Sequence, residues 1–427
     1  MPNSQDTAPV TDSLAVWLRW LETLSAHEIE LGLERVQTVL QRLDLPRPRR
    51  VLHVAGTNGK GSTVAMLEAL YLQRGDSVAC YTSPHVVRYN ERMRIQGQVL
   101  EDAEIVASLR RVEAVRDGIP LTYFEFGTLA AFVAFALRRA DVWVLEIGLG
   151  GRLDAVNALD PDAAVITNIS LDHCDWLGPD TESIAREKAG VMRRGIPVVY
   201  AAAQPPAAIV RIAEELAARL YVAGRDYEVS AEGGSWSYSG AEFSFTGLRK
   251  PGLHGRFQID NAAGALTLYT LLEGVIDPAT VDRAFARLRL QGRMQRIDTT
   301  RHWLLDVAHN PGAAQVLAAT LREEYPGRRL IFVMGVLADK DLAGILQPVV
   351  ALADAWIAVT PANPRALPAS ALAARIANVA NIPCRIANSV AEGLGIAERI
   401  AGDDDLVVVT GSFFTVGPAT EVLVPAA

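Results

Sequence analysis

The clearest chemical signal in the sequence is the glycine-rich segment Val54-Ala55-Gly56-Thr57-Asn58-Gly59-Lys60-Gly61-Ser62-Thr63. Glycines let backbone N–H groups close around phosphate oxygens, and a helix that begins at such a loop adds partial positive charge. Lys60 would reach the β- and γ-phosphates of a nucleotide, and Ser62 or Thr63 would offer a hydroxyl to magnesium. The ordinary P-loop pattern would instead place a glycine at Val54 and a hydroxyl residue at Gly61. A strand–helix turn without a ligand is the alternative, but it leaves the lysine and the hydroxyls unexplained. We therefore predict a Mg-ATP site on this segment.

Glu146 ends a second expected strand, Asp141–Ile147, and precedes the run Gly148-Leu149-Gly150-Gly151-Arg152. Ligand sites of parallel sheets lie beyond the carboxyl ends of the strands. A carboxylate there can hold Mg²⁺ directly or through water. A helix cap or an ion pair with Arg152 would explain Glu146 equally well, so this residue alone does not decide between the two interpretations.

Asp172 and His173 follow a third expected strand, Ala163–Asn168. Magnesium prefers oxygen ligands, so a histidine ligand would be unusual and would favour Mn²⁺. A lone histidine is more often a packed or surface residue than a ligand. Lys188 lies on an expected helix, Thr181–Met192, where the pattern alone predicts an exposed lysine.

The segment Asp306-Val307-Ala308-His309-Asn310-Pro311 brings a carboxylate, an imidazole and an amide to the end of a strand in the second half of the chain. In a two-domain enzyme such an edge can face a phosphate loop across a cleft. Pro311 also suits the first turn of the helix that follows, so part of the segment is ordinary capping. No Gly-x-Ser-x-Gly elbow is present and no cysteine lies in a nucleophile context, so covalent acyl-enzyme chemistry is unsupported.

Composition limits the classes of protein that fit. The chain has 427 residues, half of them hydrophobic, which is more than one domain usually holds. Its formal net charge of −8 argues against a nucleic-acid-binding protein. Three widely spaced cysteines argue against a disulfide framework or a structural zinc site and fit a reducing compartment. Residues 1–10 lack an apolar signal core and no apolar run is long enough to span a bilayer, so we expect a cytoplasmic protein without membrane contact. Arg47, Arg49 and Arg50 alternate with prolines and are expected in a solvated loop.

The elements that would position these residues alternate between strands and helices. Such alternation predicts a mostly parallel sheet with helices on both faces. In the first part of the chain the expected strands are Val51–Ala55, Ser77–Tyr81, Asp141–Ile147, Ala163–Asn168 and Pro197–Ala201, and the expected helices are Ser62–Arg74, Thr181–Met192, Asn261–Leu272 and Pro278–Leu288. Ser235–Phe245 interrupts the alternation and reads as a hairpin in a small antiparallel sheet, with its turn around Ser239–Gly240.

A second alternation begins after Arg293. Its expected strands are Trp303–Val307, Leu330–Met334, Trp356–Val359 and Leu406–Thr410, and its expected helices are Ala313–Tyr325, Leu342–Ala353, Ala369–Val379 and Val390–Ala401. The predicted fold is therefore α/β with two domains. Residues 1–296 would form a P-loop-type, mostly parallel sheet with flanking helices, and residues 297–427 a smaller Rossmann-like α/β domain.

Together these segments resemble the Mur ligase superfamily, and within it the family of bacterial bifunctional dihydrofolate synthases/folylpolyglutamate synthases. The matching segments run in family order over nearly the whole chain. They are His53–Thr63, Thr82–His85 with Asn90–Arg92, Phe124–Thr128, Leu145–Ala155, Leu171–His173 with Trp176–Gly178, Arg186–Gly190, Gly292–Arg293, Asp306–Pro311 and Gly411–Phe413.

The resemblance implies roles for individual residues. The implied ATP-binding residues are Gly59, Lys60, Gly61, Ser62, Asn261, Arg293 and Asp306, and the implied ligands of Mg²⁺ (two ions, with Mn²⁺ as the alternative) are Ser83, Glu146 and His173. Lys60, Lys188 and His309 would be catalytic, with His309 near the transferred phosphate. Lys188 matches a lysine that is carbamylated in many relatives, a modification that turns a cation into an anionic oxygen ligand.

The resemblance also implies a dihydropteroate/folate site. Its residues would be Glu30, Leu31, Gly32, Thr122, Tyr123, Phe124, Glu125, Leu153, Asp154 and Ala155. Phe124 offers an aromatic face to a planar pterin.

The implied activity is ATP-dependent addition of L-glutamate to 7,8-dihydropteroate and to reduced folates through an acyl phosphate. The alternatives are an enzyme with folylpolyglutamate synthase activity alone, another Mur-type ligase, and a small-molecule kinase with the same phosphate loop. The metal residues past the loop and the second domain argue against a kinase. A non-catalytic ATP-binding regulator would leave Glu146, His173 and Lys188 without a joint purpose. We expect small-molecule substrates, no nucleic-acid partner and a monomer.

Overall fold

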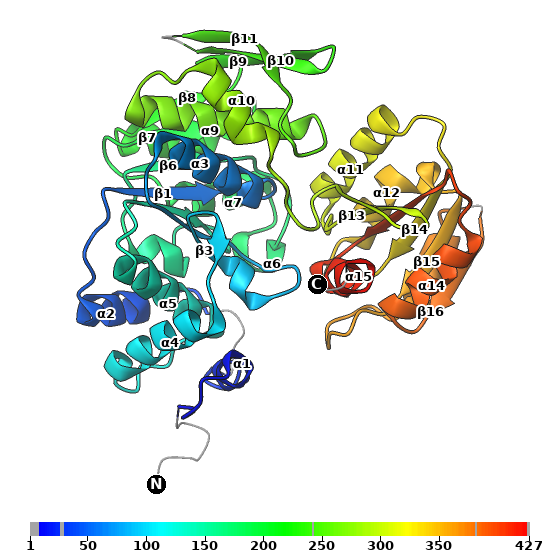
Figure 1. Cartoon of the computed structure of the whole chain (residues 1–427), viewed down its shortest axis with the longest axis horizontal. Helices are drawn as coiled ribbons and strands as arrows, with labels where there is room; N and C mark the ends of the chain where they lie inside the picture. Colours follow the sequence, from blue (N-terminus) through cyan, green and yellow to red (C-terminus); the bar gives the residue numbers. More distant parts are fainter. Residues whose placement is uncertain (1–7, 26–29, 241–242, 381, 425–427) are drawn as a thin grey trace. The chain divides into compact units, whose positions relative to one another are not determined.

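The computed structural model describes residues 8–25, 30–240, 243–380 and 382–424. The chain forms two compact units, which Figure 1 shows coloured along the sequence. The first unit comprises the described residues of Met1–Pro84, Tyr89–Arg249 and Asp260–Ala286, and the second those of His85–Arg88, Lys250–Ile259 and Arg287–Ala427. A single domain boundary near residue 296 stays a prediction.

A mostly parallel sheet of eight strands forms the centre of the first unit. Its strands are β1 (Arg50–Ala55), β2 (Val78–Tyr81), β3 (Met93–Ile95), β4 (Gln98–Val99), β5 (Val142–Glu146), β6 (Ala163–Ile166), β7 (Pro197–Tyr200) and β8 (Arg219–Val222). Their order is β4-β3-β2-β5-β1-β6-β7-β8, antiparallel between β4, β3 and β2 and parallel from β2 to β8. β2, β5, β6 and β7 are buried along their whole length, which is why they read as apolar runs rather than alternating patterns.

Helices cover both faces of this sheet, as Figure 1 shows. The helices from Leu14 to Ala286, some of which pack on other helices rather than on the sheet, are α1 (Leu14–Leu21), α2 (Glu34–Leu43), α3 (Lys60–Arg74), α4 (Asp102–Arg116), α5 (Tyr123–Leu137), α6 (Cys174–Leu177), α7 (Thr181–Ala189), α8 (Ala207–Glu215), α9 (Phe257–Glu273, which begins in the second unit) and α10 (Pro278–Ala286), with 3-10 turns at Tyr89–Arg92 and Ala155–Ala158. Side chains of α2, α4 and α5 share one hydrophobic core with the face of the sheet that carries Val51 and Trp143. α3 contacts β1, β2 and β5 without joining that core, so it covers the opposite face.

The small antiparallel sheet expected from the sequence is confirmed, and it has three strands. They are β9 (Tyr227–Glu232), β10 (Ser235–Gly240) and β11 (Ser244–Arg249), in the order β11-β10-β9. β10 continues through Ser239 and Gly240, so the reversal comes later than predicted, between Gly240 and Ser244, and includes residues outside the described ranges. The Tyr238 hydroxyl lies 3.1 Å from the Thr267 hydroxyl on α9, which joins this sheet to the helical layer.

The second unit is a six-stranded sheet with helices on both faces. Its strands are β12 (Gln295–Asp298), β13 (His302–Asp306), β14 (Leu330–Met334), β15 (Ala355–Val359), β16 (Cys384–Ala387) and β17 (Leu406–Thr410), and its helices are α11 (Pro311–Glu324), α12 (Leu342–Val349), α13 (Ala369–Ala377), α14 (Val390–Ile400) and α15 (Phe413–Leu423), with a 3-10 turn at Val350–Leu352. The order is β12-β13-β17-β14-β15-β16, parallel except between β12 and β13. The α/β fold with a parallel-rich first sheet is therefore confirmed.

Three arginines surround the buried carboxylate of Glu273, the last residue of α9. Arg49, Arg50 and Arg74 all pair with Glu273, whose side chain is only 4% exposed. Arg49 is exposed in the loop before β1, as predicted. The predicted solvated loop is wrong for Arg50, because this residue begins β1 and its side chain is a half-buried ion-pair partner. The network ties the end of α9 to the amino end of β1.

Replacing Glu273 with glutamine is expected to lower the free energy of unfolding by about 2 kcal/mol, since hydrogen bonds to a charged group are lost and three arginines face one another. Urea unfolding followed by circular dichroism would measure it. Glu215→Gln removes an exposed pair with Arg211 and should cost less than about 0.5 kcal/mol. Equal midpoints for the two variants would contradict a stabilising role of the Glu273 network.

Among the described residues, none of the helices combines the length and the apolar character that crossing a membrane requires.

Candidate functional site

The loop that joins β1 to α3 is fastened to the end of β6 by hydrogen bonds. The backbone N–H of Thr57 donates to the Asn168 carbonyl at 2.9 Å. The Asn58 carbonyl accepts from Thr167 Oγ1 at 2.6 Å and from Asn168 Nδ2 at 3.0 Å. The loop is therefore shaped by its own protein contacts, which is what a preformed phosphate site requires.

Two glycines of this loop have backbone conformations that other residues rarely adopt. Gly56 has a φ of +140° and Gly59 a φ of +84°. A Cβ at Gly56 would lie 1.8 Å from Thr167 Oγ1, and a Cβ at Gly59 would lie 2.7 Å from Asn261 Oδ1. Asn261 on α9, a predicted ATP-binding residue, therefore lies directly against the loop.

Replacing Gly59 with alanine should reduce kcat/KM for Mg-ATP by roughly 10²-fold, because both the loop and Asn261 have to shift by about an ångström. Steady-state kinetics at varied Mg-ATP would measure this. Gly75→Ala, at the other end of α3, is the matched control: its φ is also positive at +92°, but no atom lies within 4 Å of the added Cβ. If both variants lose the same activity, backbone strain rather than the contact with Asn261 explains the effect.

Lys60 and Lys188 meet at the carbonyl oxygen of Gly56. Lys60 Nζ donates to the carbonyls of Gly56 and Thr57, both at 3.1 Å. Lys188 Nζ donates to the same Gly56 carbonyl at 2.9 Å. Two amines that are far apart in sequence thus converge on the phosphate loop.

Lys188 is buried, with 5% of its surface exposed, so the exposed helical lysine that the pattern alone predicts is wrong. The physical reason is a close approach of backbones: a Cβ at Gly151 would lie 2.8 Å from the Glu187 carbonyl, and a Cβ at Gly190 would lie 2.3 Å from Arg152 Cα. Burial, and then the charge of Lys60, lower the pKa of Lys188 to about 7. A neutral amine, which this environment favours, is the form that reacts with CO₂.

Glu146 lies at the same edge of the sheet. It is the last residue of β5 and is buried, and its Oε2 accepts a hydrogen bond from the Ser83 backbone N–H at 3.2 Å. A Cβ at Gly61, in the first turn of α3, would lie 3.6 Å from the same oxygen. Two of the predicted metal ligands, Ser83 and Glu146, are therefore neighbours beside the phosphate loop.

His173 is placed in the loop after β6, at the amino end of α6, with a positive φ of 52°. Its Nε2 lies 4.0 Å from Asp172 Oδ2, and its side chain is 39% exposed. Among the described residues, no three His, Cys, Asp or Glu side chains gather as a metal-binding cluster. A site built from a serine, a glutamate, a histidine and a modified lysine would not form one of that kind.

The segments predicted to bind dihydropteroate come together in the first unit. Thr122 caps α5, and its backbone N–H donates to Glu125 Oε2 at 2.7 Å. Arg35 on α2 bonds both Glu125 and Glu30, which joins two of these segments. Glu30 is exposed, whereas Thr122 and Glu125 are buried.

Phe124 links its own acceptor segment, Thr122–Glu125, to the third one, Leu153–Ala155. A Cβ at Gly148 would lie 2.5 Å from the Phe124 ring, so the ring lies on the glycine loop that follows Glu146. Leu153, Asp154 and Ala155 continue from this loop, and Asp154 accepts the backbone N–H of Leu149 at 2.8 Å. Burial raises the pKa of Asp154 to about 6, although its backbone hydrogen bonds and the charge of Lys60 act to lower it.

The second unit places Arg293, Asp306 and His309 close to one another. Asp306 accepts the backbone N–H groups of Met294 and Ala308, both at 2.9 Å, and burial raises its pKa. The Arg293 guanidinium lies over the Phe413 ring at 5.5 Å, and the His309 ring lies 5.7 Å from the same ring. His309 Nδ1 lies 2.8 Å from the Val307 carbonyl, which favours the tautomer with a proton on Nδ1.

Sequence reasoning did not single out Thr167, Asn168, Arg35 or Phe413 as site residues. The position of Asn168, at the end of an expected strand, was the one available signal for its contact with the loop. Arg35 is visible only in three dimensions, because its partner Glu125 is 90 residues away.

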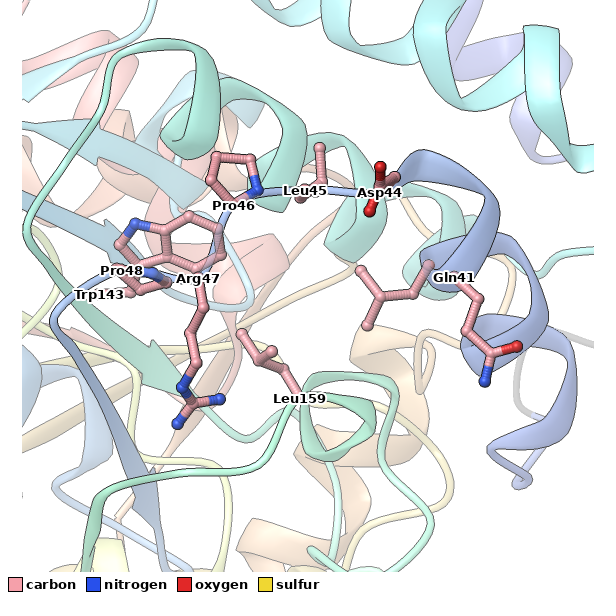
Figure 2. A pocket seen from close by; sticks show the side chains of 9 residues that line it. Gln41, Asp44, Leu45, Pro46, Arg47, Pro48, Trp143 and Leu159 are labelled. Carbon is pink, nitrogen blue, oxygen red and sulfur yellow. The ribbon is translucent and has the colours of Figure 1, made fainter.

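A cavity of about 330 Å³ lies in the first unit, away from this site. Figure 2 shows Pro46, Pro48, Arg47, Trp143 and Leu159 around it. Pro48 precedes β1, so the cavity is at the amino ends of the strands, roughly 20 Å along β1 from the phosphate loop. It is not part of the candidate active site.

Residues 54–269 match the family model of the Mur ligase middle domain, and residues 292–413 match that of the Mur ligase glutamate ligase domain. The phosphate loop and the Asp306–His309 strand end fall in these two domains, so fold and sequence agree on a Mur ligase. The chain is 39% identical over 418 residues to dihydrofolate synthase/folylpolyglutamate synthase of Escherichia coli (strain K12), covering 98% of this chain and 97% of the relative. The chain belongs to the dihydrofolate synthase/folylpolyglutamate synthase family of Mur ligases.

Solved structures agree. E. coli FolC in complex with DHPP and ADP superposes with a TM-score of 0.91 at 39% identity, covering 98% of each chain. A bifunctional folylpolyglutamate synthase/dihydrofolate synthase with Mn, AMPPNP and L-glutamate bound has a TM-score of 0.89 at 40% identity, covering 99% of this chain and 100% of that one.

Proposed function

We propose that this chain is an ATP-dependent ligase that adds L-glutamate to 7,8-dihydropteroate, forming dihydrofolate, and to reduced folates, forming folylpolyglutamates. The observation that carries the proposal is the phosphate loop with Lys60, Lys188 and Glu146 around it, in a chain that matches bifunctional enzymes over its full length. The ligands of the related structures, which are ADP, AMPPNP, Mn, L-glutamate and DHPP, are the classes of molecule that such a reaction uses.

The chemistry follows from charge. A carboxylate is a poor acceptor for an amine, because its carbon is electron-rich and oxide does not leave. Attack of a carboxylate oxygen of the acceptor on the γ-phosphorus of ATP forms an acyl phosphate and releases ADP. The neutral α-amine of glutamate then attacks the acyl carbon, inorganic phosphate leaves, the amine loses its proton, and an amide results.

The residues of the phosphate loop are assigned to ATP. α3 begins at Lys60, so the backbone N–H groups of Gly59, Gly61 and Ser62 lie at its amino end. The partial positive charge of this end of the helix favours phosphate groups. Lys60 offsets the negative charge that accumulates as two anions meet. Asn261 lies against Gly59, where it limits the shape of the loop.

In the second unit, Arg293 and Asp306 are assigned to ATP, and His309 to the region of the transferred phosphate. Arg293 is held by its contact with Phe413, and Asp306 by two backbone N–H groups. The Asp306 carboxylate orders the backbone at Met294 and Ala308. Arg293 and His309 directly adjoin these two residues in sequence, so their positions are fixed as well.

Ser83, Glu146 and His173 are assigned to magnesium, and the buried carboxylate of Glu146 next to Ser83 fits this hard cation. Lys188 would join them as a carbamate. Two Mg²⁺ ions, with Mn²⁺ as the alternative, belong to the same proposal. When bound, the metal supplies positive charge to the triphosphate.

The acceptor is assigned to Glu30–Gly32, Thr122–Glu125 and Leu153–Ala155. Phe124 gives an aromatic face to the pterin, and Thr122 and Glu125 fix the start of α5, on which Phe124 lies.

The experiment measures ADP release with Mg-ATP and L-glutamate, with dihydropteroate in one series and tetrahydrofolate in the other. Products heavier by one glutamyl unit in both series support the proposal. Turnover of tetrahydrofolate alone would identify folylpolyglutamate synthase activity only. ADP release that does not depend on glutamate would indicate a kinase or an ATPase and would contradict a ligase.

Two further properties stay predictions that the sequence makes. They are a location in the cytoplasm and a monomeric state. Size-exclusion chromatography with light scattering would measure the oligomeric state directly.

A further inference from the structure

Arg35 connects two segments of the acceptor site without belonging to either. The residue lies in the first turn of α2. Its Nη2 donates to the Glu30 carbonyl at 3.1 Å and to Glu125 Oε1 at 2.8 Å, and its Nη1 donates to the Glu30 carboxylate. One guanidinium therefore holds both a backbone and a side-chain oxygen of the first segment, and a carboxylate of the second.

The buried carboxylate of Glu125 is stabilised by the positive charge of Arg35. Its side chain is 4% exposed, and its other oxygen accepts the backbone N–H of Thr122 at 2.7 Å. Among the described residues, Arg35 is the ion-pair partner of Glu125. Arg35 itself is only partly buried, but its removal leaves the charge of a buried carboxylate uncompensated, which displaces the groups bonded to it.

The segment Glu30–Gly32 lies outside any helix or strand, and its first residue is exposed. A loop of this kind is ordered by contacts with its neighbours rather than by internal hydrogen bonds. An arginine that donates from both Nη atoms provides directional contacts that a lysine cannot reproduce, because the guanidinium presents its donors in a fixed plane.

We propose that Arg35 is a positioning residue for the acceptor, which fixes the Glu30–Gly32 segment and the start of α5 in the arrangement that binds the pterin. The inference rests on the proposed function, since it concerns the acceptor of that reaction. Ordering both segments before binding lowers the entropy that the acceptor loses on binding. Loss of Arg35 therefore weakens acceptor binding and leaves the phosphate loop unchanged.

The test compares Arg35→Gln and Arg35→Lys with the parent enzyme, with KM measured separately for dihydropteroate, tetrahydrofolate and Mg-ATP. Arg35→Gln is expected to raise both acceptor KM values by roughly tenfold or more, as loss of a supporting residue typically does. The KM for Mg-ATP should stay within about twofold. Arg35→Lys keeps the positive charge but not the planar set of guanidinium donors. Its acceptor KM values should therefore lie between those of the parent and of Arg35→Gln.

Arg42→Gln is the matched control. Arg42 lies on the same helix, and its guanidinium also bonds a distant segment, but it donates to the carbonyls of Val115 and Arg116. Its KM values should equal those of the parent enzyme.

Acceptor KM values for Arg35→Gln within twofold of the parent would overturn the inference. A parallel rise of the Mg-ATP KM would do the same, because it would indicate general damage. If Arg35→Gln does not fold, Arg35→Lys decides: parental acceptor KM values would reject a positioning role, and raised values with a normal Mg-ATP KM would support it. A parent enzyme without glutamate-dependent turnover would instead refute the proposed function, which keeps the two failures distinct.

Discussion

Replacing Lys188 with alanine is expected to reduce glutamate-dependent ADP release by more than about 10²-fold, since loss of even an outer partner of a metal ligand costs about 10–100-fold. The side chain is buried and donates to the Gly56 carbonyl, so the change acts directly on the phosphate loop. A short-chain carboxylate such as acetate or propionate should restore part of the activity, because it can replace the carbamate oxygens in the space that the lysine leaves.

Arg186→Ala is the control for this experiment. Arg186 lies on the same helix but is exposed, so its activity should be that of the parent enzyme. Mass analysis of the parent without acid should show a CO₂ adduct on the peptide that contains Lys188. Full activity of Lys188→Ala would refute the carbamate, and equal losses in both variants would indicate damage to α7.

Replacing Lys60 with glutamine is expected to lower kcat by roughly 10²–10³-fold, the loss typical of one preorganised donor to developing negative charge. The loop is also held by hydrogen bonds from Thr167 and Asn168 to the Asn58 carbonyl, so it should keep its resting shape without the Lys60 ammonium. Single-turnover measurement of ADP formation would isolate this step from product release.

The same variant should change Lys188. Burial lowers the pKa of Lys188 most, and the charge of Lys60 lowers it further, so removal of that charge should raise the pKa above about 7 and leave less neutral amine at neutral pH. The CO₂ adduct at Lys188 should therefore decrease in Lys60→Gln and remain in Lys250→Gln, where the lysine is exposed. An unchanged adduct would show that the two lysines are not electrically coupled.

Strands and amphipathic helices were predictable where the chain repeats a regular pattern. β14 and β17 have the predicted bounds, because each is a short apolar run between loop residues. α5 gave no such signal: it is buried on nearly every position, so it has no polar face that would reveal a helical period. The edge strands β12 and β16 are partly exposed and short, which leaves little pattern to recognise.

The candidate site divides in a similar way. The phosphate loop is local in sequence, so its glycines and lysine were visible without a structure. The burial of Lys188 depends on the close approach of Gly151 and Gly190 to other backbone segments, and a helical pattern cannot report such contacts. The ion pair between Arg35 and Glu125 joins residues that are 90 positions apart, so a local sequence pattern cannot report it either.

The path of the chain between its two units bears on how such an enzyme could be divided or recombined. Before it reaches the long final segment of the second unit, the chain has already contributed His85–Arg88 and Lys250–Ile259 to it. Val86 is partly buried and packs against the core of that unit, and a Cβ at Gly417 would lie 2.2 Å from the Val86 carbonyl oxygen. A fragment that begins after Ala286 would therefore lack part of its own interior. Domain exchange at a junction after Ala286 would therefore leave His85–Arg88 and Lys250–Ile259 behind with the first unit.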